Sequence, residues 1–364
     1  DLPTLEGRGH VSLALYRHDR PAPLLFILPG FGASPYFGVA PYLAGVFHRE
    51  GFHVVILPSP MSWNFALAAS RSGVPGYAPE DARDLYAVMQ KTLAVLKTRY
   101  AMMPTGIYFL GFSLGGLEGA YLSLIDTREK SLGVELYLLI NPPIDLAHGV
   151  NKIAEWSALA RKFGPEKSQN LIARALAIVD AFSYEPGDER AVIDRFVKRF
   201  DVFTTEEIQF LIAENLQRQI PELVYVTQVL HDRNVLTAPK TDFRARLNEA
   251  RSFSLKDYKQ KIALPLWQKQ LGLPQADPDS FLKRGSLAPI VEELRANPRA
   301  HVMHNADDVL VERQAVESLK NALGGQMTVY PRGGHLGNVW FPENQSDALR
   351  FFRSPLSSKL AGPR

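Results

Sequence analysis

The stretch that decides the fold is residues 107–125, which read IYFLGFSLGGLEGAYLSLI. Its first part, Ile107–Leu110, is a short apolar run, typical of a strand buried on both faces of a parallel sheet. From Leu114 to Ile125 the pattern is helical. The stretch therefore predicts a buried strand that passes into a helix within a few residues.

The turn between this strand and this helix is Gly111-Phe112-Ser113-Leu114-Gly115. Such an abrupt turn leaves no room for large side chains at 111 and 115, so glycine fits both positions. It forces Ser113 into a strained backbone conformation and lifts its hydroxyl clear of the sheet, and the Leu114 N–H points at the same space. The turn offers a candidate nucleophile; the plain alternative is a tight turn with an incidental serine.

Similar apolar runs alternate with helical patterns in the first and last parts of the chain. The longest helical pattern is Pro79–Tyr100, and the weakly alternating His10–Tyr16 could form an edge strand. This alternation predicts an α/β fold with a mostly parallel central sheet flanked by helices. The further predicted strands are Leu24–Leu28, His53–Leu57, Val134–Ile140, Ala300–His304 and Gln326–Tyr330.

The segment 146–284 differs from the rest, because its patterns are helical and no convincing strand alternation occurs in it. One helix has a clear start at Thr204, where Glu207 three residues later completes a capping box. We therefore predict a core made of residues 1–145 and 285–364, interrupted by a helical insert at 146–284.

The turn at Ser113, in this setting of strands and helices, resembles the nucleophile elbow of the α/β-hydrolase family. The resemblance covers the core and not the insert. It implies an α/β-hydrolase fold and a Ser–Asp–His order of catalytic residues along the chain. In this family a long helical insert at this position acts as a cap over the active site, so the resemblance also implies an α-helical cap.

The insert carries many large apolar residues. Most of them are needed for its own packing, and some could line a pocket for an acyl chain. They include Trp156, Phe163, Leu171, Ile172, Phe182, Phe196, Phe203, Phe210 and Tyr225.

A serine hydroxyl is a poor nucleophile at neutral pH and needs an oriented base. Among nine histidines, His335 stands out, because it lies in the glycine-rich loop 332–337 after the last predicted strand, where the family has its histidine. The loop reads RGGHLG. For each of the other eight histidines, a structural role is the simpler interpretation.

The imidazole needs a carboxylate to fix its tautomer and to stabilise the imidazolium. The family's acid often lies a few residues after the strand that here ends at His304, followed by apolar residues. Asp308, directly before Val309-Leu310-Val311, fits best. Asp307 is more simply a turn former or a solvent-facing neighbour, and Asp145 is a third candidate.

An oxyanion needs two preorganised backbone donors. The Leu114 N–H is one, and we expect the other to be the Phe31 N–H in the loop after Leu24–Leu28. Many relatives have His-Gly in this loop, whereas this chain has Pro29-Gly30, which excludes the HGGG type of esterase loop. A plain glycine-rich turn is the alternative.

Composition and motifs exclude several other classes. The 364 residues include 41 Lys and Arg and 38 Asp and Glu, so the net charge of +3 argues against a strongly basic nucleic-acid binder. With no cysteine there can be no disulfide, thiolate metal site or cysteine nucleophile. No phosphate-binding loop, dinucleotide fingerprint, HExxH or calcium loop occurs, so we expect neither a cofactor nor a metal.

The predicted activity is hydrolysis of a small-molecule acyl or lipid-like carboxylic ester through an acyl-serine intermediate. Thioesters, amides and peptides pass through the same intermediate, so a thioesterase or a peptidase stays open, as does a non-catalytic binding protein. The apolar runs are too short to span a membrane, although transient contact with a membrane surface is compatible with the charge. Because the sequence begins at Asp1, a removed leader or trimming is implied, and export to the periplasm is slightly favoured over a cytoplasmic location.

Overall fold

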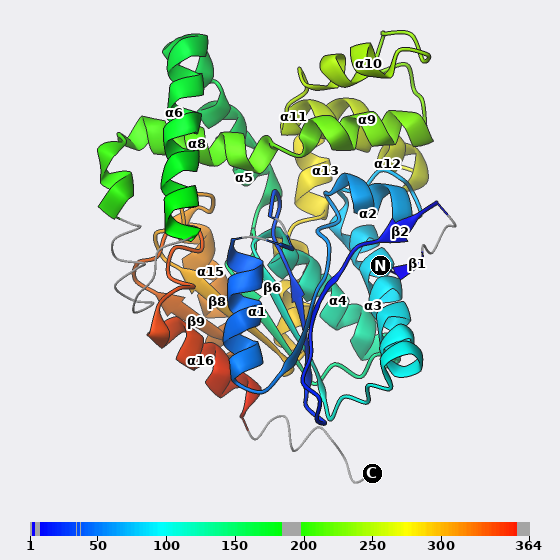
Figure 1. The fold of residues 1–364 in the computed structure, drawn as a ribbon, viewed down its shortest axis with the longest axis vertical. Coiled ribbons are helices and arrows are strands. Elements are labelled where there is room, and N and C mark those ends of the chain that lie inside the picture. Colours follow the sequence, from blue (N-terminus) through cyan, green and yellow to red (C-terminus); the bar gives the residue numbers. More distant parts are fainter. Residues whose placement is uncertain (1, 4–7, 34, 37, 184–197, 355–364) are drawn as a thin grey trace.

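The computed structural model describes residues 2–3, 8–33, 35–36, 38–183 and 198–354. Its centre is a seven-stranded sheet in the order β3-β5-β4-β6-β7-β8-β9 (Figure 1). Within this sheet β3 runs antiparallel to β5, and all other neighbours are parallel. The strands are β3 (Ala14–Tyr16), β4 (Leu24–Leu28), β5 (His53–Ile56), β6 (Ile107–Phe112), β7 (Leu136–Ile140), β8 (Ala300–Asn305) and β9 (Met327–Tyr330).

The inner strands are apolar on both sides. Every residue of β4, β5 and β7 is buried, which is the pattern of a parallel sheet covered by helices on both faces. One face is covered by α1 (Val39–Arg49) and α16 (Pro342–Phe352). The opposite face is covered by α3 (Ala78–Tyr100), α4 (Leu114–Glu129), α14 (Val291–Arg295) and α15 (Arg313–Leu323).

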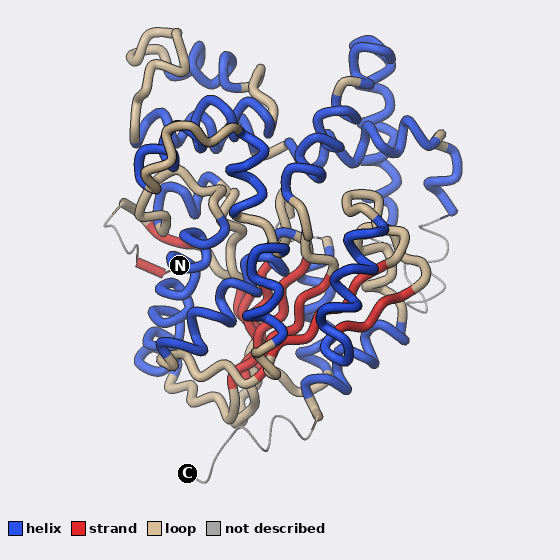
Figure 2. The backbone as a smooth tube through the Cα atoms, turned by 180° about the vertical axis from the view of Figure 1, so that it is seen from behind, coloured by secondary structure: helices blue, strands red, loops and turns tan. Residues whose placement is uncertain are grey.

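Figure 2 shows the resulting layers from behind, with the strands enclosed by helices. The predicted α/β class is therefore confirmed. The predicted edge strand His10–Tyr16 is divided: its first two residues pair as β2 (His10–Val11) with β1 (Leu2–Pro3), and its last three form β3. A short helix, α2 (Trp63–Ala68), and the 3₁₀ turns Ala288–Ile290 and Gly324–Gln326 complete the core.

All regular secondary structure in the described residues between β7 and residue 284 is helical. The capping box that the sequence predicts at Thr204 and Glu207 starts α8, and a π-helix, Tyr258–Ala263, connects α11 to α12. A 3₁₀ turn, Phe200–Val202, comes shortly before α8. The helices are α5 (Leu146–Ser157), α6 (Leu159–Ser183), α8 (Thr205–Gln217), α9 (Ile220–Leu230), α10 (Phe243–Ala250), α11 (Leu255–Asp257), α12 (Leu264–Gln270) and α13 (Pro278–Arg284).

These helices stand beyond one end of the sheet (Figure 1). One small apolar cluster, with Leu171, Phe203 and Phe210 at its centre, holds α6 to α8. A larger cluster joins the remaining helices to Met61, Val74 and other core residues, so this part of the segment packs directly on the core. No helix in the described ranges is both long and apolar enough to cross a membrane. Phe182 and Phe196 lie outside the residues whose side chains are described.

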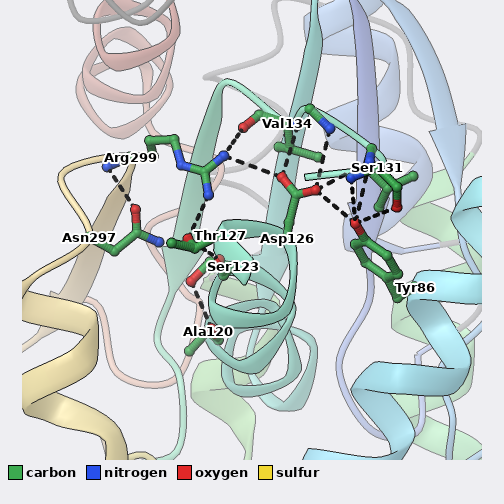
Figure 3. Close-up of polar contacts among 11 residues, drawn as sticks. Tyr86, Ala120, Ser123, Asp126, Thr127, Ser131, Val134, Asn297 and Arg299 are labelled. Atoms are coloured by element: carbon green, nitrogen blue, oxygen red, sulfur yellow. Dashed lines mark hydrogen bonds and ion pairs between the residues drawn. The ribbon is translucent and has the colours of Figure 1, made fainter. Parts of the chain in front are cut away.

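A buried polar network fixes the opposite end of the sheet (Figure 3). Asp126, at the end of α4, is fully buried and accepts hydrogen bonds from Tyr86 Oη at 2.9 Å, Val134 N at 3.1 Å and Arg299 Nη1 at 3.2 Å. The Val134 carbonyl accepts a further bond from Arg299. Because both backbone groups of Val134 are used in this way, β7 begins at Leu136 and not at Val134 as the apolar run predicts.

Candidate active site

The turn after the central strand β6 has the conformation that the sequence predicts. Ser113 has φ 55° and ψ −128°, which is strained for a residue other than glycine. A Cβ at Gly111 would lie 2.1 Å from the Gly115 carbonyl oxygen, and a Cβ at Gly115 would lie 2.2 Å from the Leu28 carbonyl oxygen. Neither position could hold a larger residue without moving the turn.

The structure brings Ser113, His335 and Asp308 together from segments far apart in the sequence. Ser113 Oγ lies 2.8 Å from His335 Nε2, and His335 Nδ1 lies 2.9 Å from Asp308 Oδ2. An ionised carboxylate can only accept hydrogen bonds, so Nδ1 carries the imidazole proton and Nε2 is left to accept one from the serine. The three groups form the chain of contacts expected for a nucleophile, a base and an orienting acid.

The Asp308 side chain is fully buried, and its carboxylate has two further donors. Asn141 Nδ2 donates to Oδ2 at 2.9 Å, and Leu310 N donates to Oδ1 at 3.0 Å. Burial opposes ionisation, but the charge and hydrogen bond of His335, the nearby His304 and the Leu310 N–H together hold the pKa of Asp308 below its ordinary value. The carboxylate form is therefore stabilised where it faces the histidine.

The other candidates have different places. Asp307 is exposed and accepts a hydrogen bond from Gly334 N at 2.8 Å, beside His335. Asp145 caps α5 by accepting from the backbone of Ala147. His304 is fully buried behind the site, and burial lowers its pKa. None of these three contacts the Ser113 hydroxyl.

The expected oxyanion donors lie beside the nucleophile. A Cβ at Gly30 would lie 2.7 Å from Ser113 Cβ, so the loop that carries Phe31 touches the serine side chain. Leu114 is the first residue of α4, where a backbone N–H has no partner within the helix. In the described chain neither the Phe31 N–H nor the Leu114 N–H donates to another backbone group.

Part of the helical insert lies against this site. A Cβ at Gly32 would lie 3.0 Å from the Asn215 carbonyl oxygen and 3.2 Å from Leu216 Cα, so the end of α8 rests on the loop after β4. Phe31 and Leu114 pack against the same apolar cluster as Leu216. Ser113 is only 8% exposed.

Three asparagines behind the site, Asn141, Asn305 and Asn338, were not predicted from the sequence. The sequence feature that could have pointed to two of them is their position: Asn141 follows β7 and Asn305 ends β8, both at the carboxyl edge of the sheet. In the described part of the chain, no group of three or more His, Cys, Asp or Glu side chains is arranged to hold a metal ion.

Comparison with known proteins finds no family model and no curated protein that matches this chain. It is similar to solved structures at low identity. An α/β hydrolase, GrgF from Penicillium sp. sh18, is 15% identical with a TM-score of 0.46, over 99% of this chain and 97% of that one. The thioesterase domain from the curacin biosynthetic pathway is 11% identical with a TM-score of 0.45, over 100% and 98%. The Pyrococcus furiosus esterase Pf2001 is 11% identical with a TM-score of 0.43, over 97% and 87%.

These similarities concern the fold alone and name no substrate for this chain. The chain's own features define its class: a mostly parallel sheet, a strained serine turn after the central strand, and an acid and a histidine that follow in that order. The protein has the α/β-hydrolase fold.

Proposed function

We propose that this protein is a serine hydrolase that cleaves carboxylic esters through an acyl-serine intermediate. Ser113 is the nucleophile, His335 the general base and Asp308 the orienting acid. The observation that carries the proposal is the chain of contacts from Ser113 Oγ to His335 Nε2 at 2.8 Å and from His335 Nδ1 to Asp308 Oδ2 at 2.9 Å. A strained turn holds the serine in this chain.

In the first half of the reaction, the Ser113 oxygen bonds to the ester carbonyl carbon while its proton passes to His335 Nε2. The carbonyl oxygen becomes negative, and the N–H groups of Phe31 and Leu114 donate to it. His335 then gives the proton to the alcohol oxygen as the carbon–oxygen bond breaks. In the second half, water repeats these steps against the acyl-serine and releases the acid.

The substrate we infer is a small-molecule ester with an apolar acyl group. We infer that the helical insert acts as a cap, because the end of α8 lies against the loop after β4 and because Phe31 and Leu114 pack against the same apolar cluster as Leu216. An apolar, largely dry site also strengthens the oxyanion contacts. Thioesters and amides fit the same chemistry, so both belong in the test.

The test is labelling with a fluorophosphonate probe, followed by a panel of esters, thioesters and aminopeptidase substrates. Wild-type protein should be labelled and Ser113→Ala should not, while the melting temperatures of the two should agree. We expect the mutant to keep less than about a thousandth of the wild-type kcat. A wild-type protein that resists the probe and turns over none of the panel would instead be a non-catalytic binding protein.

A further inference from the structure

Three buried asparagine side chains lie behind the acid and the base. Asn141, Asn305 and Asn338 are 1%, 0% and 3% exposed. Asn141 directly follows β7, Asn305 is the last residue of β8, and Asn338 lies three residues after His335. Burying an amide is unfavourable unless its hydrogen bonds are made, so three together indicate a connected network.

The orientation of each amide follows from the carboxylate at one end. Asp308 can only accept, so Asn141 must turn its NH₂ group towards Oδ2, where it lies at 2.9 Å. The Asn141 oxygen then faces Asn305 Nδ2 at 3.4 Å. Asn305 and Asn338 bond reciprocally, with Asn305 Nδ2 to Asn338 Oδ1 at 2.9 Å and Asn338 Nδ2 to Asn305 Oδ1 at 2.8 Å. Asn305 Nδ2 has two hydrogens, and the Asn338 oxygen and the Gly334 carbonyl, both at 2.9 Å, are its nearest acceptors. Asn141 and the Asn305–Asn338 pair therefore act on the site separately, Asn141 on the acid and the pair on the histidine loop.

The same network holds the loop that carries His335. Asn305 Nδ2 donates to the Gly334 carbonyl at 2.9 Å, while Gly334 N donates to Asp307 Oδ1 at 2.8 Å. Gly333 packs so closely that a Cβ there would lie 2.5 Å from Asn305 Nδ2. Asn338, three residues after His335, holds the other end of the loop through its two hydrogen bonds with Asn305. The residue before His335 and a residue after it are therefore both tied to the end of β8, three residues before Asp308.

This inference rests on the proposed function. We propose that Asn141, Asn305 and Asn338 are positioning residues for the triad of Ser113, His335 and Asp308. Asn141 fixes the plane of the Asp308 carboxylate, so that Oδ2 faces His335 Nδ1. The Asn305–Asn338 pair fixes the loop of His335 against the same strand end. Together they set the distance and the angle between acid and base before any substrate binds.

This role differs from a purely structural one in what it predicts. Without the Asn141 donor, the Asp308 carboxylate keeps two donors and can turn away from His335. A small misplacement of a reacting group costs up to about a hundredfold in rate, so kcat should fall about tenfold to a hundredfold while KM changes little. A carboxylate turned away from His335 also stabilises the imidazolium less, which moves the midpoint of the pH–rate profile to lower pH.

The variant that isolates the amide is Asn141→Gly. Asn141 has a left-handed backbone with φ 47°, which glycine adopts without steric cost, so this change removes the amide without adding backbone strain. Asn141→Asp keeps the shape but replaces the donor with an acceptor, and should lose more activity than Asn141→Gly. The matched control is Asn297→Gly, which removes a buried asparagine at the other end of β8 (Figure 3).

We would measure kcat, KM, the pH–rate midpoint, the fluorophosphonate labelling rate and the melting temperature of each variant, with Ser113→Ala as the unlabelled reference. We expect Asn141→Gly to fold, to label slowly and to show the lower midpoint, while Asn297→Gly changes the melting temperature alone. A folded Asn141→Gly with the kcat and midpoint of wild type would overturn the positioning role and leave the proposed function intact. A wild-type protein that neither labels nor hydrolyses any ester would overturn the proposed function, and the positioning role with it.

Discussion

The Asp308 carboxylate accepts hydrogen bonds on both oxygens, from His335 and Asn141 on Oδ2 and from Leu310 N on Oδ1. An amide cannot replace it. If the amide of an Asp308→Asn variant turned its oxygen towards His335, its NH₂ would face the Leu310 N–H; if it turned the other way, its NH₂ would face the imidazole N–H. Each orientation sets a donor against a donor, or forces the histidine into the wrong tautomer.

We therefore expect Asp308→Asn to lower kcat by about ten-thousandfold. Asp307→Asn is the matched control, because its side-chain oxygen can still accept from Gly334 N and the residue is exposed. That variant should lose little activity. Steady-state kinetics of the two purified variants is sufficient. Were the ranking reversed, the acid would be Asp307, and two harmless substitutions would return attention to Asp145.

At the scale of elements, three buried ionisable groups lie where the helical insert packs on the core. Asp81 lies in the first turn of α3, Glu118 in α4 one turn after the nucleophile, and Lys259 in the π-helix of the insert. Lys259 Nζ donates to the Gly76 carbonyl, and Asp81 Oδ2 accepts from Gly76 N at 2.7 Å. Tyr258 Oη donates to the Pro75 carbonyl at 2.7 Å, so two neighbouring residues of the helical insert hold one core loop.

Burial governs the protonation of this cluster. It raises the pKa of Asp81 to about 7 and that of Glu118 well above its ordinary value, and it lowers the pKa of Lys259 to about 8. Because a raised carboxyl pKa favours the folded protein in acid, the stability from Asp81 is fully present below about pH 4 and is lost as pH rises through about 7, and the stability from Glu118 is lost in the same direction. Near pH 7 the positive charge of the Lys259 ammonium offsets the negative charge of the Asp81 carboxylate as it ionises.

Lys259→Met should therefore destabilise the protein more at pH 8 than at pH 5. At pH 5 both carboxyls are protonated, and the variant loses chiefly one hydrogen bond. At pH 8 Asp81 is largely ionised and Lys259, with a pKa of about 8, is still partly protonated, so the variant removes a cation from beside a buried negative charge and loses more stability. The difference in melting temperature from wild type, measured at both pH values, tests this. Lys256→Met, an exposed lysine in α11, is the control and should show no such difference. A Lys259→Met penalty that is equal at the two pH values would contradict the charge role.

At the scale of the whole molecule, the sequence predicts the sheet because strands that are buried on both faces consist of continuous apolar runs. It also predicts Ser113, since the turn needs Gly111 and Gly115 for steric reasons that are local. The boundary at Val134 was missed, because Arg299 and Asp126 take its backbone groups from outside the strand. For the same reason the asparagine network could not be predicted: its members lie in three segments, and only the fold brings them together.

The last prediction concerns the proposed cap, and it rests on the proposed ester hydrolysis. Leu216 of α8 packs against the same apolar cluster as Phe31 and Leu114, and its backbone lies against Gly32, so we expect an acyl chain that extends from Ser113 to meet apolar side chains of the insert. Each methylene buried there is worth about 0.8 kcal/mol, close to a fourfold preference per carbon. We expect kcat/KM for a series of straight-chain esters to climb over several carbons before it levels.

Leu216→Ala should flatten this climb, because it removes part of the apolar wall. Leu176→Ala, on the 57% exposed Leu176 of α6, should leave the climb unchanged. Ester hydrolysis across the acyl series, with wild type and both variants, provides the measurement. If kcat/KM fell steadily from the acetyl ester upwards in wild type, the acyl pocket would be wrong although the triad could still act. A cap variant that lowered all esters equally would place Leu216 in the packing of the cap and not in contact with the acyl chain.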